Sequence, residues 1–212
     1  MVSDRQLRAM RLYCDLMEEV KIRLACIDAA TMGSTGLPGP IVRELCFLQL
    51  RMICELIALG CLVAHGDIKA AHSGKFQKEY SAQNILENLG KLHPDFYPFP
   101  VIVKRMPDGN FEMEHDSTQH FSKEELLGFY GKSGASLHRG SLKKLLKPQM
   151  PVETHFRSIT SIADKIRKLL GMHTHYLFDR SQFICQLSNP NDRGRTTVIS
   201  TTPMQPGRGP GG

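Results

Sequence analysis

Several residue patterns that identify common protein classes are missing from this chain of 212 residues. Tryptophan is absent and aromatic residues make up only 7% of the sequence, so we expect a core of aliphatic and Met side chains, which suits packing between helices. None of the six cysteines belongs to a CxxC pair, which argues against a disulfide framework and favours a reducing compartment. No glycine-rich nucleotide loop, nucleophile elbow or HExxH helix is present, and we expect no cofactor.

The N-terminus has no apolar signal region, because residues 1–5 lead directly into a charged amphipathic stretch. One segment, residues 45–64, is apolar enough and about long enough to span a membrane. It carries Gln49, Arg51 and Glu55 near its middle, and each charge there would cost a few kcal/mol in a bilayer. We therefore predict a buried core helix, no membrane partner and a cytoplasmic location.

Apolar residues recur at three- and four-residue steps in the N-terminal half and predict helices over residues 4–30, 40–65 and 77–91. A linker rich in Gly and Pro separates the first two, so they should form a long antiparallel hairpin. The second of these helices is apolar on nearly all faces, and we expect other elements to surround it.

The C-terminal half mixes strands and helices. β-Branched residues and a Pro-Asp-Gly turn predict a β-hairpin over residues 101–115. Ser122 and Glu125 form a capping box at the start of a helix that reaches about His138, and Phe121 and Leu126 are placed as a hydrophobic staple. A short basic turn over 142–147 and a helix over 152–170 follow, and then strands near 176–179, 182–188 and 195–202.

These elements predict an α+β fold, mainly α, in a single domain over residues 1–203. A helical part spans residues 1–94 and an α+β part spans 95–203, with small antiparallel β-hairpins. Whether the β elements join in one sheet is left open by the sequence. The Pro- and Gly-rich residues 204–212 are expected to be a disordered tail.

Charged residues within the most apolar helix are the least expected polar groups in the sequence. Glu44, Arg51 and Glu55 lie at steps of seven and four, so they share one stripe of this helix. Buried charges need partners, which predicts either an ion network that fixes helix register or a polar pocket inside the bundle. His173 and His175 should point to one face of a strand, and His155, Asp179 or Cys185 could supply a third metal ligand. A third ligand of this kind can be proposed for almost any pair, so we expect no metal site.

The stretch LLGFYGKSGASLHRG, residues 126–140, resembles a helix of uncharacterised bacterial helical proteins, some of them similar to the HEPN group. The resemblance implies a small helical bundle that often dimerises. Active HEPN members cleave RNA with an Arg followed, after four to six residues, by a His. Arg167 and His173 have this spacing and are the candidate catalytic pair, although Lys168 departs from the polar, non-basic residue that commonly follows the Arg.

Charge is distributed unevenly along the chain. Residues 1–100 hold eleven basic and eleven acidic residues, whereas residues 132–212 hold thirteen basic and four acidic, a net charge of +9. A basic region either contacts a polyanion or is a solvated face. We therefore expect a non-catalytic binding protein, with a homodimer as a further expectation, that uses Arg139, Lys143, Lys144 and Lys147 to contact RNA, DNA or an acidic protein. The alternative is a HEPN-like ribonuclease.

Overall fold

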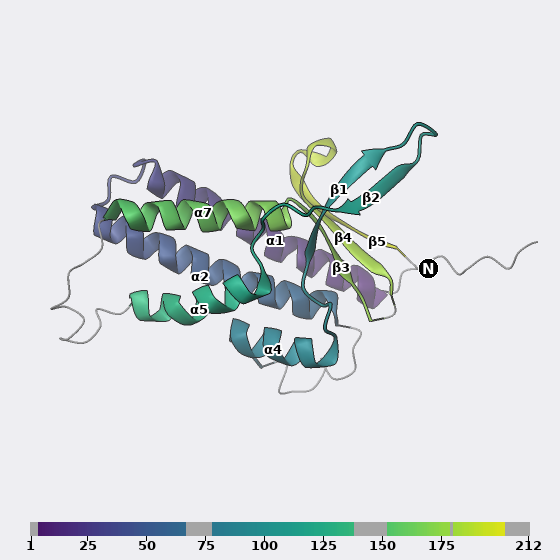
Figure 1. Cartoon of the computed structure of the whole chain (residues 1–212), viewed down its shortest axis with the longest axis horizontal. Helices are drawn as coiled ribbons and strands as arrows, with labels where there is room; N and C mark the ends of the chain where they lie inside the picture. The colour runs from purple at the N-terminus through teal and green to yellow at the C-terminus, as the bar shows by residue number, and fades with distance from the viewer. Residues whose placement is uncertain (1–3, 67–77, 138–151, 179, 202–212) are drawn as a thin grey trace, which may run out of the picture.

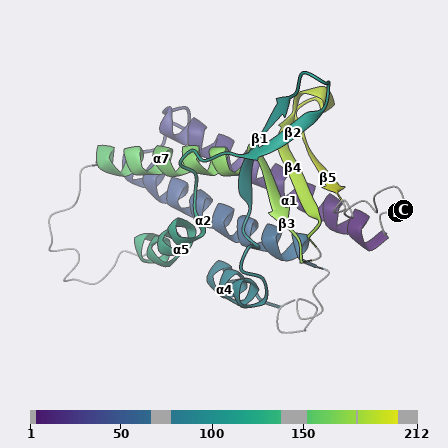
Figure 2. The same cartoon turned by 45° about the vertical axis from the view of Figure 1, so that its right-hand side comes forward.

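The computed structural model describes residues 4–66, 78–137, 152–178 and 180–201. Within these ranges, five helices pack together and a five-stranded antiparallel sheet lies at one end of them, with a hairpin of two of its strands extending away from the helices (Figures 1 and 2). The predicted α+β fold with a dominant helical part is confirmed.

The helical hairpin consists of α1 (Asp4–Thr31) and α2 (Gly39–Ala64). Pro40 lies in the first turn of α2, where its missing N–H costs nothing, and Gly33 and Gly36 adopt positive φ in the linker. α4 (Ala82–Leu92), α5 (Lys123–Leu137) and α7 (Val152–Leu170) all contact α2. α2 is thus the central helix, as the sequence predicted.

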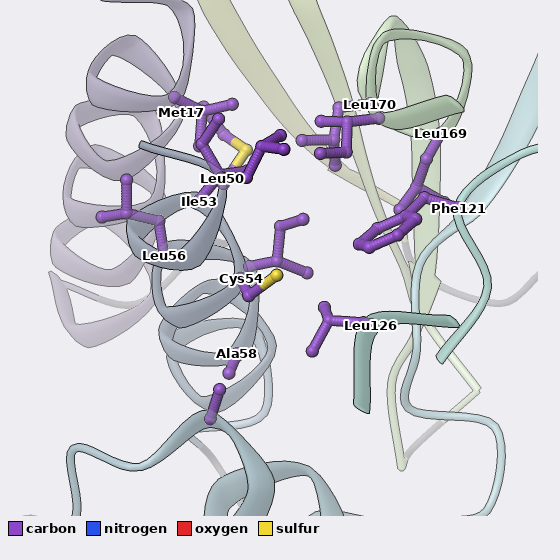
Figure 3. Packing of buried hydrophobic residues seen from close by; sticks show 14 of the residues in the cluster. Met17, Leu50, Ile53, Cys54, Leu56, Ala58, Phe121, Leu126, Leu169 and Leu170 are labelled. Atoms are coloured by element: carbon purple, nitrogen blue, oxygen red, sulfur yellow. The ribbon is translucent and has the colours of Figure 1, made fainter. Parts of the chain in front are cut away.

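The core is aliphatic around α2. Leu50, Ile53 and Cys54 are fully buried there, and Leu126 of α5 and Leu169 of α7 approach α2 from other helices (Figure 3). α2 is also the one described helix whose length and composition would suit a membrane span, and half of its most apolar stretch is buried inside the protein. This burial is the property expected of a core helix.

The start of α5 is fixed by local chemistry. The Ser122 side chain accepts a hydrogen bond from the Glu125 N–H at 3.1 Å, and the Glu125 carboxylate accepts one from the Ser122 N–H at 3.1 Å. Phe121 and Leu126 are both buried. The predicted capping box is confirmed, and Phe121 and Leu126 lie on the core side as expected of a staple.

The β elements join in one sheet with the strand order β2-β1-β3-β4-β5. Its strands are β1 (Phe99–Arg105), β2 (Phe111–His115), β3 (Met172–Tyr176), β4 (Gln182–Asn189) and β5 (Arg195–Thr201). The predicted strand at 176–179 is wrong: β3 begins directly after Gly171 and ends at Tyr176. Its sequence, Met-His-Thr-His-Tyr, is polar, yet its three central residues are buried, so the strand is covered on both faces.

Candidate functional site

The outer face of α7 carries a group of basic residues from the C-terminal half of the chain. Its inner face buries Ile159, Ala163 and Ile166 in the core. The opposite side presents residues at steps of four, three and four, namely Arg157, Ser161, Asp164 and Lys168. The amphipathic pattern that holds the helix in place therefore also arranges these side chains in a row.

This row lines an open polar groove with a volume of about 360 Å³. The groove is bordered by Gln119 from the loop before α5 and by six residues of α7: Arg157, Thr160, Ser161, Asp164, Lys165 and Lys168. Lys165 donates to the Glu125 carboxylate at 2.5 Å, which fixes one wall. Arg157 and Lys168 are exposed, and neither forms an ion pair with any residue in the described ranges. Their charges are therefore directed to solvent.

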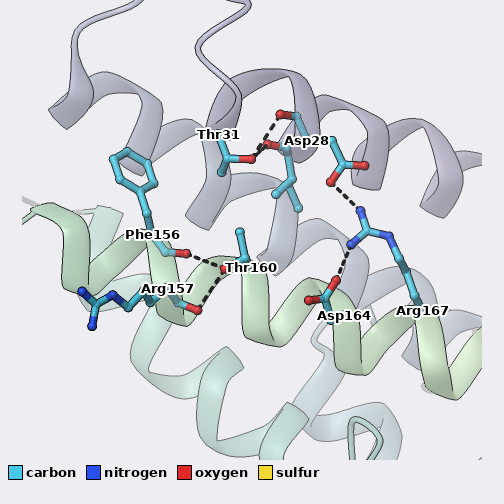
Figure 4. Close-up of polar contacts among 8 residues, drawn as sticks. Asp28, Thr31, Phe156, Arg157, Thr160, Asp164 and Arg167 are labelled. Atoms are coloured by element: carbon cyan, nitrogen blue, oxygen red, sulfur yellow. Dashed lines mark hydrogen bonds and ion pairs between the residues drawn. The ribbon is translucent and has the colours of Figure 1, made fainter.

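Arg167 lies beside the groove, on the side of α7 that faces α1. Its guanidinium bridges the Asp28 carboxylate of α1 at 2.6 Å and the Asp164 carboxylate at 2.9 Å (Figure 4). The side chain is about one-third exposed, at 36%. These contacts tie α7 to α1 and occupy the guanidinium of the residue that the HEPN resemblance makes catalytic.

His173, the other candidate catalytic residue, is fully buried. Its Nδ1 lies 2.9 Å from the Leu170 carbonyl oxygen, and its Nε2 lies 2.6 Å from the Tyr13 hydroxyl. Burial lowers the pKa of His173 to about 4, so the ring is neutral at pH 7. Arg167 and His173 thus have separate partners, one on the surface and one in the core.

His175 shares the face of β3 with His173, as the alternation of a strand predicts. Its Nε2 lies 2.9 Å from the same Tyr13 hydroxyl, and its Nδ1 lies 3.1 Å from the Phe96 carbonyl oxygen. Nothing in the sequence indicates Tyr13 as their common partner, because it lies 160 positions before His173. Among the residues with described positions, no group of three His, Cys, Asp or Glu is arranged to hold a metal.

The predicted polar network on α2 exists in part. Arg51 Nε lies 3.5 Å from the Glu55 carboxylate, and both side chains are about three-quarters covered, with 26% and 21% exposed. Arg51 also donates to the Tyr130 carbonyl at 3.1 Å, and its guanidinium stacks on the Tyr130 ring at 3.9 Å. The Tyr130 hydroxyl donates to the Glu55 carboxylate at 3.0 Å, so each of the three residues contacts the other two. The network therefore joins α2 to α5.

Glu44 lies outside this network. Its carboxylate is 3.9 Å from Arg43, and 46% of its side chain is exposed. Glu44 has no partner on another helix in the described ranges, because α5 covers α2 at Arg51 and Glu55 but leaves the Glu44 side chain about half exposed. Arg139, Lys143, Lys144 and Lys147 lie outside the described residues.

Comparison with known proteins gives this chain no relatives: no family model, no curated protein and no solved structure matches it. Any proposal about function therefore depends on the geometry of the groove on α7, the Arg51 network and the buried histidines.

Proposed function

We propose that this chain is a non-catalytic nucleic-acid-binding protein that contacts phosphates through the groove on α7. The observation that supports this most directly is the pair of unpaired, exposed cations, Arg157 and Lys168, at opposite ends of an open polar groove. Arg and Lys provide most contacts to phosphate oxygens in complexes with nucleic acids. Ser161 and Gln119 add neutral hydrogen-bonding groups between them.

The composition of the groove indicates which kind of binding to expect. Among the residues whose positions are described, no aromatic side chain borders it, so this part of the chain offers no platform on which bases could stack. Arg167 is shared between Asp164 and Asp28, and Lys165 pairs with Glu125, which leaves a modest positive charge. We therefore expect weak binding that depends strongly on salt and little on base sequence.

Titration of labelled single-stranded RNA and duplex DNA at several salt concentrations tests this proposal. The variant Arg157→Gln/Lys168→Gln removes two cations from the groove. If each contacts one phosphate, the slope of log affinity against log salt should fall by about 1.4 for single-stranded RNA. Arg8→Gln/Arg11→Gln is the matched control, because both residues are exposed on α1 and form no ion pair in the described part of the chain.

Four results would contradict the proposal. Binding that is absent at low salt would remove it, as would equal losses in the groove variant and the control. Preference for an acidic peptide over both nucleic acids would indicate a protein partner instead. RNA that is cleaved as well as bound, with cleavage lost in a folded Arg167→Ala variant, would favour the HEPN-like ribonuclease.

A further inference from the structure

The buried group formed by Tyr13, His173 and His175 contains fewer protons than its contacts require. The Leu170 and Phe96 carbonyl oxygens can only accept hydrogen bonds, so Nδ1 of each histidine must carry a hydrogen. A neutral imidazole has one N–H, which leaves a lone pair on each Nε2. Both lone pairs face the Tyr13 oxygen, at 2.6 Å and 2.9 Å, and its hydroxyl can donate to only one of them.

His65 lies next to this group, and its neutral ring also has fewer hydrogens than its hydrogen-bond contacts require. Its Nδ1 is 2.8 Å from the Cys61 carbonyl oxygen and its Nε2 is 3.2 Å from the Tyr176 carbonyl oxygen. Two acceptors require two N–H groups, which only the charged imidazolium has. The ring centroids of His65 and His175 are 5.8 Å apart, so His65 belongs to the same buried cluster as His173 and His175.

The surroundings oppose a positive charge. The titratable groups around the cluster are Cys14 of α1, Cys61 of α2, His93 and Tyr97 of the segment before β1, and Cys185 of β4. Glu18 of α1 acts on Cys185 and already accepts hydrogen bonds from Lys21 and from the Thr196 N–H. Within the described ranges, no carboxylate bonds to any of these rings. One additional hydrogen bond does not repay the lost hydration of an unpaired imidazolium.

The short contacts are hydrogen-bond distances and leave no room for a metal. Zinc bound tetrahedrally at 2.0–2.1 Å keeps its ligands about 3.3 Å apart. The Tyr13 oxygen lies well inside that distance from both nitrogens. The group therefore has the geometry of hydrogen-bonded neutral rings and not that of a metal site.

We propose that Tyr13, His173 and His175 form an acid-sensitive latch that holds α1 against the sheet while the rings are neutral and releases it when they are protonated. The latch joins three elements that are distant in sequence. Tyr13 belongs to α1, both histidines belong to β3, and the Leu170 carbonyl is at the end of α7. Its opening separates α1 from β3 and frees the C-terminal turn of α7.

The direction of the pH effect follows from the neutral state of the folded rings. Burial lowers the pKa of His65, His173 and His175 below the ordinary value near 6.5, so the unfolded chain binds more protons than the folded one. The free energy of unfolding has its full value above about pH 6.5. It falls as the pH decreases towards the pKa that these histidines have in the folded protein. At pH 5, each neutral ring lowers the folding equilibrium constant about 30-fold.

Nitrogen NMR of the imidazole rings tests the proton count directly. At pH 7.5, His173 and His175 should both carry hydrogen on Nδ1 and none on Nε2. A ring with hydrogen on Nε2, or a charged ring, would overturn the proposal. So would a stoichiometric bound metal whose removal changes these spectra.

The variant His175→Gln tests the latch itself, because the Gln amide can donate to Tyr13 without a charge. The variant loses the hydrogen bond between His175 Nδ1 and the Phe96 carbonyl oxygen and gains one from the Gln amide to the Tyr13 oxygen. Urea unfolding at pH 7.5 and at pH 5 gives the factor by which acid lowers the folding equilibrium constant. We expect this factor to be about 30 times smaller in the variant than in the wild-type protein. His120 is half-buried, and its hydrogen bond is to the Thr118 carbonyl oxygen and not to the buried group, so the His120→Gln variant should leave the pH dependence largely unchanged.

Hydrogen exchange locates the opening. In the wild-type protein, acidification to pH 5 should increase the opening of α1 and β3, after correction for the intrinsic exchange rate, before that of α4. A wild-type pH dependence in His175→Gln, or equal opening in all helices, would refute the latch. If His175→Gln does not fold, His173→Gln makes the same test, and the NMR measurement on the wild-type protein stands independently.

Discussion

Replacing Arg51 with Met removes the charged centre of the network between α2 and α5 while keeping a long side chain in the core. The guanidinium donates to the Tyr130 carbonyl at 3.1 Å, stacks on the Tyr130 ring at 3.9 Å and lies 3.5 Å from Glu55. A hydrogen bond from a charged group contributes about 1.5–3 kcal/mol. Stacking on the ring contributes about 0.5–1 kcal/mol at a partly exposed site, and the pair with Glu55, four residues away on the same helix, about 0.3–0.5 kcal/mol.

These contributions are not additive, and the new Met side chain recovers some packing. We therefore expect Arg51→Met to lower the free energy of unfolding by about 2–3 kcal/mol, somewhat less than the 3–5 kcal/mol typical of a fully buried pair. For a chain of this size the melting temperature should fall by about 5–10 °C. Calorimetry and urea unfolding measure the two quantities.

A control variant separates this effect from a general loss of charge. Arg11→Met removes an exposed Arg of α1 that has no ion pair in the described part of the chain, and it should change the melting temperature little. In the double variant with Glu55→Gln, the two losses should not add, because the residues share Tyr130. A melting temperature of Arg51→Met equal to that of the wild type would show that the network contributes nothing.

Two further variants test the packing around the fold. Ser122→Ala removes the side-chain oxygen of the capping box and should cost about 1 kcal/mol by urea unfolding, whereas a cost near zero would mean that water replaces the cap. Gly60→Ala places a Cβ 3.1 Å from the Tyr13 ring, which two histidines hold in place, so we expect destabilisation of about 1–3 kcal/mol despite the better helix propensity of Ala. The control Gly128→Ala, which meets nothing within 4 Å, should be neutral or stabilising, and a stabilising Gly60→Ala would show that Tyr13 is free to move.

The parts of the fold that the sequence predicted well are set by local interactions. The start of α5 follows from Ser122 and Glu125, and the end of α7 follows from Gly171, each within one turn of the helix end that it sets. The sequence places His173 and His175 on a strand but does not indicate that this strand is buried, because their partner Tyr13 is 160 positions away. A buried polar strand of this kind is recognised only when the groups that satisfy it are known.

The same distinction explains the candidate site. The pairing of Arg51 with Glu55 could be predicted from their four-residue spacing, but the role of Tyr130 could not, because it depends on how α5 packs on α2. Arg167 and His173 are close in sequence, yet a strand begins between them and turns His173 into the core. Spacing along the chain therefore fixed neither their distance nor their exposure.

The contacts between the first helix and the last strand have a consequence for the order in which the protein folds during synthesis. The Glu18 carboxylate accepts from the Thr196 N–H, and Lys21 donates to the Gly194 carbonyl, contacts that span 178 and 173 residues. The hairpin of α1 and α2 can form early from local contacts. Its face carrying Tyr13 then waits for β3 to β5, which are synthesised later. Until these strands are made, this face exposes apolar surface, the condition under which nascent chains aggregate or need chaperones.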